Sequence, residues 1–60
     1  MSLRPWRADE LRDFREHVRQ ILAHDWPLRH SRPDGPAIIA GQVAQLREID
    51  DELERRGLRP

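Results

Sequence analysis

Two amphipathic segments, residues 7–25 and 37–56, flank a proline-rich segment at residues 26–36, and together they account for most of this 60-residue chain. Apolar residues in the first segment recur at spacings of three and four, which places them on one face of a helix: Leu11, Phe14, Val18 and Ile21. The second segment repeats the pattern with Ile39, Val43, Leu46, Ile49 and Leu53. The sequence therefore predicts two helices, each with one apolar face.

The ends of both helices carry local signals. Pro27 disfavours helical geometry at the residue before it, so the first helix is expected to end near residue 25. Residues 26–36 contain three prolines and one glycine, and we expect them to form an irregular loop. Gly57 follows a basic last turn, with Leu58 and Leu53 spaced for the apolar contact of a Schellman cap. The second helix is therefore predicted to end at Arg56.

The small size of the chain limits the core that it can build. Ordering each residue costs about 1.5 kcal/mol, and the chain has only 14 Leu, Ile, Val and Phe residues to offset that cost. It has no cysteine, so a disulfide cannot add stability. We predict one all-α domain over residues 1–60, a two-helix antiparallel hairpin. Dimerisation or docking on a partner would complete it as a four-helix bundle.

Two apolar faces in so small a chain point to protein–protein contact as the function. We expect a homodimer, or an accessory subunit or adaptor docked on a larger assembly. A tryptophan next to the flexible loop is typical of an interface anchor, which singles out Trp26. The predicted partner-binding residues are Phe14, Val18, Ile21, Trp26, Ile39, Val43, Leu46 and Ile49.

The charges of the chain are balanced, with 11 arginines, no lysine and 11 acidic residues. This balance disfavours a nucleic-acid coat protein, although a local basic patch remains compatible with binding. Arg12, Arg15 and Arg19 form a basic stripe on the first helix that is able to contact phosphates. The alternative function is therefore a small nucleic-acid-binding regulator. Residues 1–33 carry a charge of +2 and residues 34–60 a charge of −2, which favours antiparallel pairing.

No pattern of residues indicates catalysis or cofactor binding, so we expect neither an enzyme nor a bound cofactor. Asp13 and His17 are four residues apart, but the spacing lacks the second ligand pair of a metal site, and no metal is expected. His17 and His24 flank the apolar face, which leaves pH-sensitive association as an alternative. No stretch of about 20 apolar residues is present for a membrane span, and we expect a cytoplasmic protein.

One family resemblance rests on two short stretches. The sequence from Phe14 to Ala23, followed by the stretch from Leu53 to Leu58, resembles the opening helices of acyl-CoA dehydrogenases. The resemblance implies a helical fold. The parts of that family that hold its flavin and catalytic base have no counterpart in this sequence, so it implies no activity and no site residue here.

Overall fold

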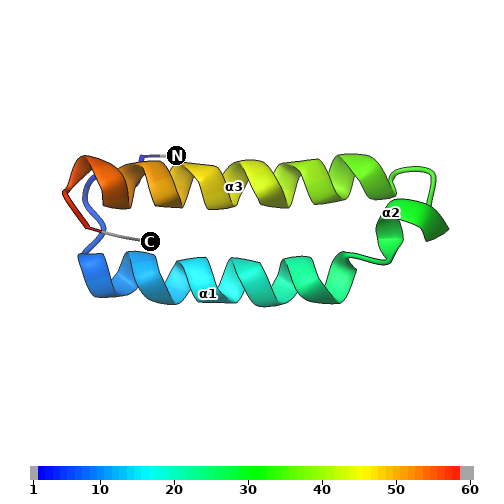
Figure 1. Ribbon diagram of the computed structural model, residues 1–60, viewed down its shortest axis with the longest axis horizontal. Coiled ribbons are helices and arrows are strands. Elements are labelled where there is room, and N and C mark those ends of the chain that lie inside the picture. The colour runs from blue at the N-terminus through cyan, green and yellow to red at the C-terminus, as the bar shows by residue number, and fades with distance from the viewer. Residues whose placement is uncertain (1, 59–60) are drawn as a thin grey trace.

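The computed structural model describes residues 2–58, and within that range it contains three helices and no strand. The helices are α1 (Ala8–Asp25), α2 (Leu28–Ser31) and α3 (Gly35–Arg55). The two long helices α1 and α3 run antiparallel, side by side, and the short α2 lies at the end where the chain reverses (Figure 1). The molecule is a rod of 38 × 17 × 16 Å. The predicted all-α fold and the packing of the two long helices are confirmed.

The prediction of an irregular loop over residues 26–36 was wrong, because this segment contains the single turn of α2. Pro27 directly precedes α2. A helix makes no hydrogen bond with the backbone N–H at this position, so proline, which lacks that N–H, is well tolerated there. The Ser31 hydroxyl and the His30 N–H both donate to the Pro27 carbonyl, at 3.2 Å each. Helix α3 begins at Gly35, two residues before the predicted start, because proline is equally well tolerated in its first turn.

The ends of the long helices follow the local sequence signals. The Arg7 N–H donates to a carboxylate oxygen of Glu10 at 3.0 Å and so closes the first turn of α1. At the end of α3, the Leu58 N–H donates to the Leu53 carbonyl and the Gly57 N–H to the Glu54 carbonyl, both at 2.9 Å. Gly57 has a φ of 77°, as the Schellman cap requires. The predicted cap is confirmed, and the last residue of the helix is Arg55.

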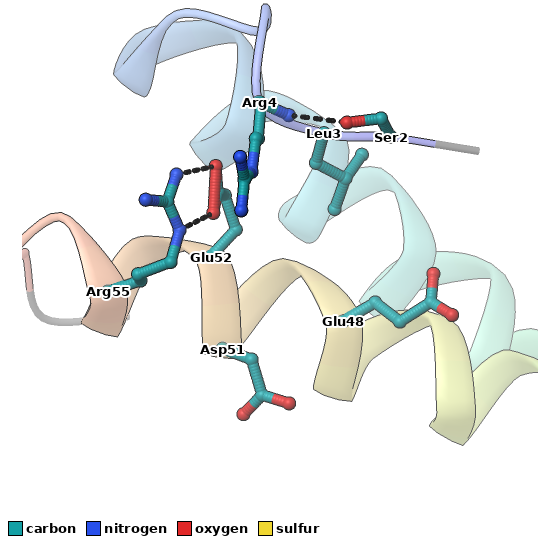
Figure 2. Close-up of a pocket in the computed structure, with 7 residues that line it drawn as sticks. All are labelled: Ser2, Leu3, Arg4, Glu48, Asp51, Glu52 and Arg55. Atoms are coloured by element: carbon teal, nitrogen blue, oxygen red, sulfur yellow. Dashed lines mark hydrogen bonds and ion pairs between the residues drawn. The ribbon is translucent and has the colours of Figure 1, made fainter.

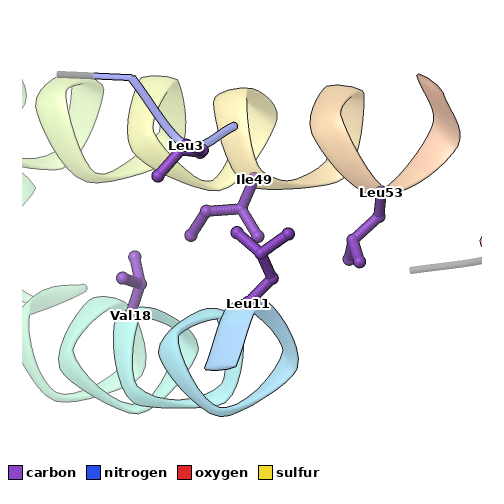
Figure 3. Close-up of a cluster of buried hydrophobic side chains, with 5 residues drawn as sticks. All are labelled: Leu3, Leu11, Val18, Ile49 and Leu53. Carbon is purple, nitrogen blue, oxygen red and sulfur yellow. The ribbon is translucent and has the colours of Figure 1, made fainter. Parts of the chain in front are cut away.

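The main core cluster joins both long helices and the N-terminal arm, which we define as residues 2–6. Figure 3 shows its five buried side chains: Leu11, Val18, Ile49 and Leu53 point into the space between the helices, and Leu3 comes from the N-terminal arm. The predicted apolar face of α1 departs from this core at Ile21, which is 39% exposed, while Leu22 is half-buried. A helix of 3.6 residues per turn drifts relative to a seven-residue repeat, and this drift rotates Ile21 away from α3.

The contact between α2 and α3 depends on Gly35, which is buried. A Cβ at this position would lie 1.7 Å from the carbonyl oxygen of Leu28 and 2.5 Å from its carbonyl carbon. Only a residue without a side chain lets the backbones approach so closely. Gly35 therefore sets how tightly the chain folds back at the α2 end.

Candidate interaction surface

The eight predicted partner-binding residues divide into three groups by exposure. Val18, Ile39 and Ile49 are buried within the hairpin and contribute to its own core. Phe14, Val43 and Leu46 are half-buried. The two large apolar side chains left exposed are Ile21 at 39% and Trp26 at 46%. Both lie at the α2 end of the molecule, so the accessible part of the predicted surface is concentrated there.

Trp26 lies between α1 and α2, and its ring is held by Arg29. The Arg29 guanidinium carbon is 4.3 Å from the centroid of the Trp26 ring, a cation–π contact. The same guanidinium donates through Nη1 to the Trp26 carbonyl at 2.8 Å. The indole therefore contacts Arg29 on one face and remains 46% exposed. Tryptophan and arginine are the residue types that dominate binding energy at protein interfaces.

A second polar contact joins the end of α1 to α3 beside Trp26. Gln42 donates through Nε2 to Asp25 Oδ2 at 2.7 Å. This hydrogen bond, together with the one from His24, lowers the pKa of the Asp25 carboxyl. The Gln42 amide oxygen is buried and accepts no hydrogen bond from the described residues. The contact joins the end of α1 to α3 near the point where the chain reverses.

The three arginines of the predicted phosphate-binding stripe have different environments. Arg15 donates through Nε to Asp50 Oδ1 at 2.6 Å and joins α1 to α3. Arg19 pairs with Glu16 on its own helix at 3.2 Å, and Arg12 is exposed. Two of the three guanidiniums are therefore engaged within the chain.

At the opposite end of the molecule, Glu52 forms the centre of an ion cluster. Its carboxylate is 8% exposed and receives two hydrogen bonds from Arg55, both at 2.7 Å. Arg56 donates to the same carboxylate at 3.2 Å and to the carbonyls of Leu3 and Arg4 at 3.0 and 2.9 Å. The Arg55 hydrogen bonds, with a smaller contribution from Arg56, lower the pKa of Glu52 from 4.5 to about 2. Arg56 thereby ties the N-terminal arm to α3.

The N-terminal arm covers one end of the core through Leu3 and Trp6. Leu3 belongs to the buried core, and the Trp6 ring stacks on Phe14 with centroids 5.1 Å apart. The signal for this contact was two apolar residues placed just ahead of the first helix. The hydrogen bonds from Arg56 are accepted by backbone carbonyls. Every residue has such a carbonyl, so the sequence could not predict these contacts.

An open pocket of about 320 Å³ lies between the N-terminal arm and α3 (Figure 2). Its lining residues are Ser2, Leu3, Arg4, Glu48, Asp51, Glu52 and Arg55. Glu48 and Asp51 are exposed, and neither forms an ion pair with any residue in the range 2–58. The rim of the pocket therefore carries two carboxylates that no described residue neutralises.

Residues 2–58 contain neither a metal-binding cluster nor a membrane-spanning helix. Across residues 2–58, no three His, Asp or Glu side chains gather closely enough to hold a metal ion. None of the helices in this range has the length and apolar character needed to cross a membrane. His17, His24 and His30 are all exposed.

Comparison with known proteins finds no match to any protein-family model, curated protein or solved structure. The resemblance to the opening helices of acyl-CoA dehydrogenases gains no support from these comparisons.

Proposed function

We propose that this chain is a non-catalytic protein–protein interaction module that presents its α2 end to a partner. The observation that carries the proposal is the exposure of Ile21 and Trp26, at 39% and 46%. Fully burying one large apolar side chain contributes about 1.5–3 kcal/mol. A chain of this size is typically stable by only about 3–5 kcal/mol. Because 39% of Ile21 and 46% of Trp26 remain to be covered, burying them would add about 1–2.5 kcal/mol, a substantial fraction of that stability.

The way in which Trp26 is held supports its role as the anchor. Binding normally costs about 0.5–1.5 kcal/mol for each flexible side chain that becomes fixed. Arg29 already restrains the indole through the ring contact at 4.3 Å, so much of this cost is met before the partner arrives. A fixed aromatic side chain at the end of a rigid rod is a suitable binding surface.

A second hairpin is the simplest partner for the half-covered residues along the two long helices. The large apolar members of this set are Phe14, Leu22, Ile38, Val43 and Leu46. Two packed helices leave such side chains at the edge of a two-layer core, and a further pair of helices covers them in a four-helix bundle. Docking on a larger protein as an accessory subunit would cover the same residues.

A photo-crosslinking experiment in the native host cells tests the proposal. A benzophenone amino acid is placed at Trp26 in one variant and at Ile21 in another. Arg12, which is exposed on α1, serves as the matched control position. We expect a discrete crosslinked product from the first two positions and none from the control.

The mass of the product distinguishes the two forms of the function. A product of twice the chain mass indicates self-association, and a larger discrete product indicates an accessory subunit. Equal, diffuse labelling from all three positions, or no product from Trp26 and Ile21, would contradict an interaction role for the α2 end.

A further inference from the structure

The N-terminal arm is joined to the long helices by few contacts. Leu3 is its one buried residue, Trp6 is half-buried, and Ser2, Arg4 and Pro5 are exposed. The open pocket of about 320 Å³ lies between the arm and α3, so the two do not pack closely along their whole length (Figure 2). Segments with few buried apolar contacts open more readily than the core of a fold.

One guanidinium holds the backbone of the arm. Arg56 donates through Nη2 to the carbonyls of Leu3 and Arg4, at 3.0 and 2.9 Å. The same nitrogen lies 3.2 Å from the buried carboxylate of Glu52. Glu52 belongs to α3, so its contact with Arg56 does not depend on the arm.

The pairing of α1 and α3 has its own contacts. Beside the arm, the Arg7 N–H donates to the Glu10 carboxylate at the start of α1, and the Leu58 N–H donates to the Leu53 carbonyl at the end of α3. Four of the five side chains in the core cluster come from the two helices, as does the ion pair that joins them. The two helices can therefore stay together when the arm is released.

The arm also contains a turn of its own. The Trp6 N–H donates to the Leu3 carbonyl at 3.1 Å, and both groups belong to the arm. Release of the arm leaves this hydrogen bond unbroken. It breaks the stacking of Trp6 on Phe14 and the two hydrogen bonds from Arg56 together.

We propose that the N-terminal arm is a strap that undocks as one unit while α1 and α3 remain paired. The docked strap covers the end of the core opposite α2 (Figure 1). The undocked strap exposes Phe14 and the part of the core that Leu3 covers. A molecule that binds the undocked form alone shifts the balance towards it, which makes the strap a conformational switch. This switch lies at the end remote from Trp26 and does not require the proposed function of the α2 end.

Thiol labelling tests the inference, because the chain has no cysteine of its own. One chain carries both Leu3→Cys, which reports on the strap, and Val18→Cys, which reports on the space between α1 and α3. Iodoacetamide labels both thiols, and peptide masses give the rate at each position. Each rate is divided by the rate at the same position in the urea-unfolded chain. Far-UV circular dichroism verifies that the chain remains helical.

We expect the thiol at position 3 to be labelled at least about tenfold faster than the thiol at position 18. Both thiols belong to the same molecule, so a strap that opens only when the hairpin opens gives equal corrected rates. Equal rates would overturn the inference. Should the substituted chain lose its helices, amide hydrogen exchange of the unsubstituted chain decides by the same criterion. The Trp6 N–H must then exchange faster than the Val18 N–H.

A second pair of variants tests the contact that holds the strap. Adding Arg56→Met removes the hydrogen bonds to the Leu3 and Arg4 carbonyls and should raise the labelling rate at position 3 by about tenfold. Arg55→Met is the matched control, because Arg55 donates to the Glu52 carboxylate and, within residues 2–58, to no group of the arm. The control should change that rate by about twofold at most. An equal effect of the two substitutions would overturn the role of Arg56 as the fastening of the strap.

Discussion

The same substitution, glycine to alanine, is expected to have opposite effects at two positions of α3. At Gly35 the new Cβ would lie 1.7 Å from the Leu28 carbonyl oxygen and 2.5 Å from the carbonyl carbon. Both are backbone atoms, so no side-chain rotation relieves the clash, and α2 must move away from α3 by more than an ångström. At Gly41 the new Cβ meets nothing within 4 Å, and the residue lies inside a helix with an ordinary φ.

The magnitudes follow from these two environments. Forcing an extra methyl into a close contact typically costs about 1–3 kcal/mol, and we expect Gly35→Ala to destabilise the fold by that amount. An alanine inside a helix is more stable than glycine by about 0.5–1 kcal/mol, and Gly41→Ala should show this gain. For a domain of this size each kcal/mol shifts Tm by about 4–8 °C, so the two variants should differ by about 6 °C or more.

Thermal and urea unfolding followed by far-UV circular dichroism measures both effects. Runs at a low and a high protein concentration separate the change within the chain from any change in self-association. The reasoning about the α2 contact fails if Gly35→Ala unfolds at or above the wild-type temperature. The reasoning about open space at Gly41 fails if Gly41→Ala is less stable than the wild type at the low concentration.

Three further perturbations address the polar and aromatic contacts. Since Arg55 above all lowers the pKa of Glu52 from 4.5 to about 2, the carboxylate stabilises the fold above pH 4.5 and loses that effect as the pH falls to about 2. Glu52→Gln should therefore flatten the acid unfolding curve in that window, and an unchanged curve would contradict this. A double-mutant cycle with Arg15→Gln and Asp50→Asn, measured by urea unfolding, should give a coupling free energy of about 0.5–1 kcal/mol between the two side chains. A coupling free energy near zero would show that this half-buried ion pair does not stabilise the fold. Trp6→Leu should lower the free energy of unfolding by about 0.5–1.5 kcal/mol, because the ring stacking on Phe14 is lost, and should weaken the near-UV circular dichroism signal. An unchanged free energy of unfolding together with an unchanged near-UV signal would contradict the stacking of Trp6 on Phe14.

Local sequence signals predicted the parts of the fold that depend on a few neighbouring residues. The cap at the end of α3 needs only Leu53, Gly57 and Leu58 in the right order, so its hydrogen bonds could be predicted from the sequence. The one-turn helix α2 was missed because proline both ends helices and begins them. The sequence signal at Pro27 was interpreted only as an end.

Features that depend on tertiary geometry could not be predicted in the same way. The spacing of Ile21 matches a core position, and its 39% exposure follows from the gradual rotation of a straight helix relative to its partner. The charge difference between the two halves of the chain favoured antiparallel pairing without showing which acidic residue the basic stripe on α1 meets, and its ion pair across the helices is with Asp50. Neighbouring residues on a helix point in directions about 100° apart, and the composition of α3 does not show which of its acidic residues faces α1.

The hydrogen bonds from Arg56 to the Leu3 and Arg4 carbonyls join residues 53 and 52 positions apart, nearly the whole chain. Contacts of such long range form after the shorter loop through α2 has closed, because α1 and α3 must first lie together. The arm therefore docks late in folding, and weakening it speeds unfolding while leaving the folding rate almost unchanged.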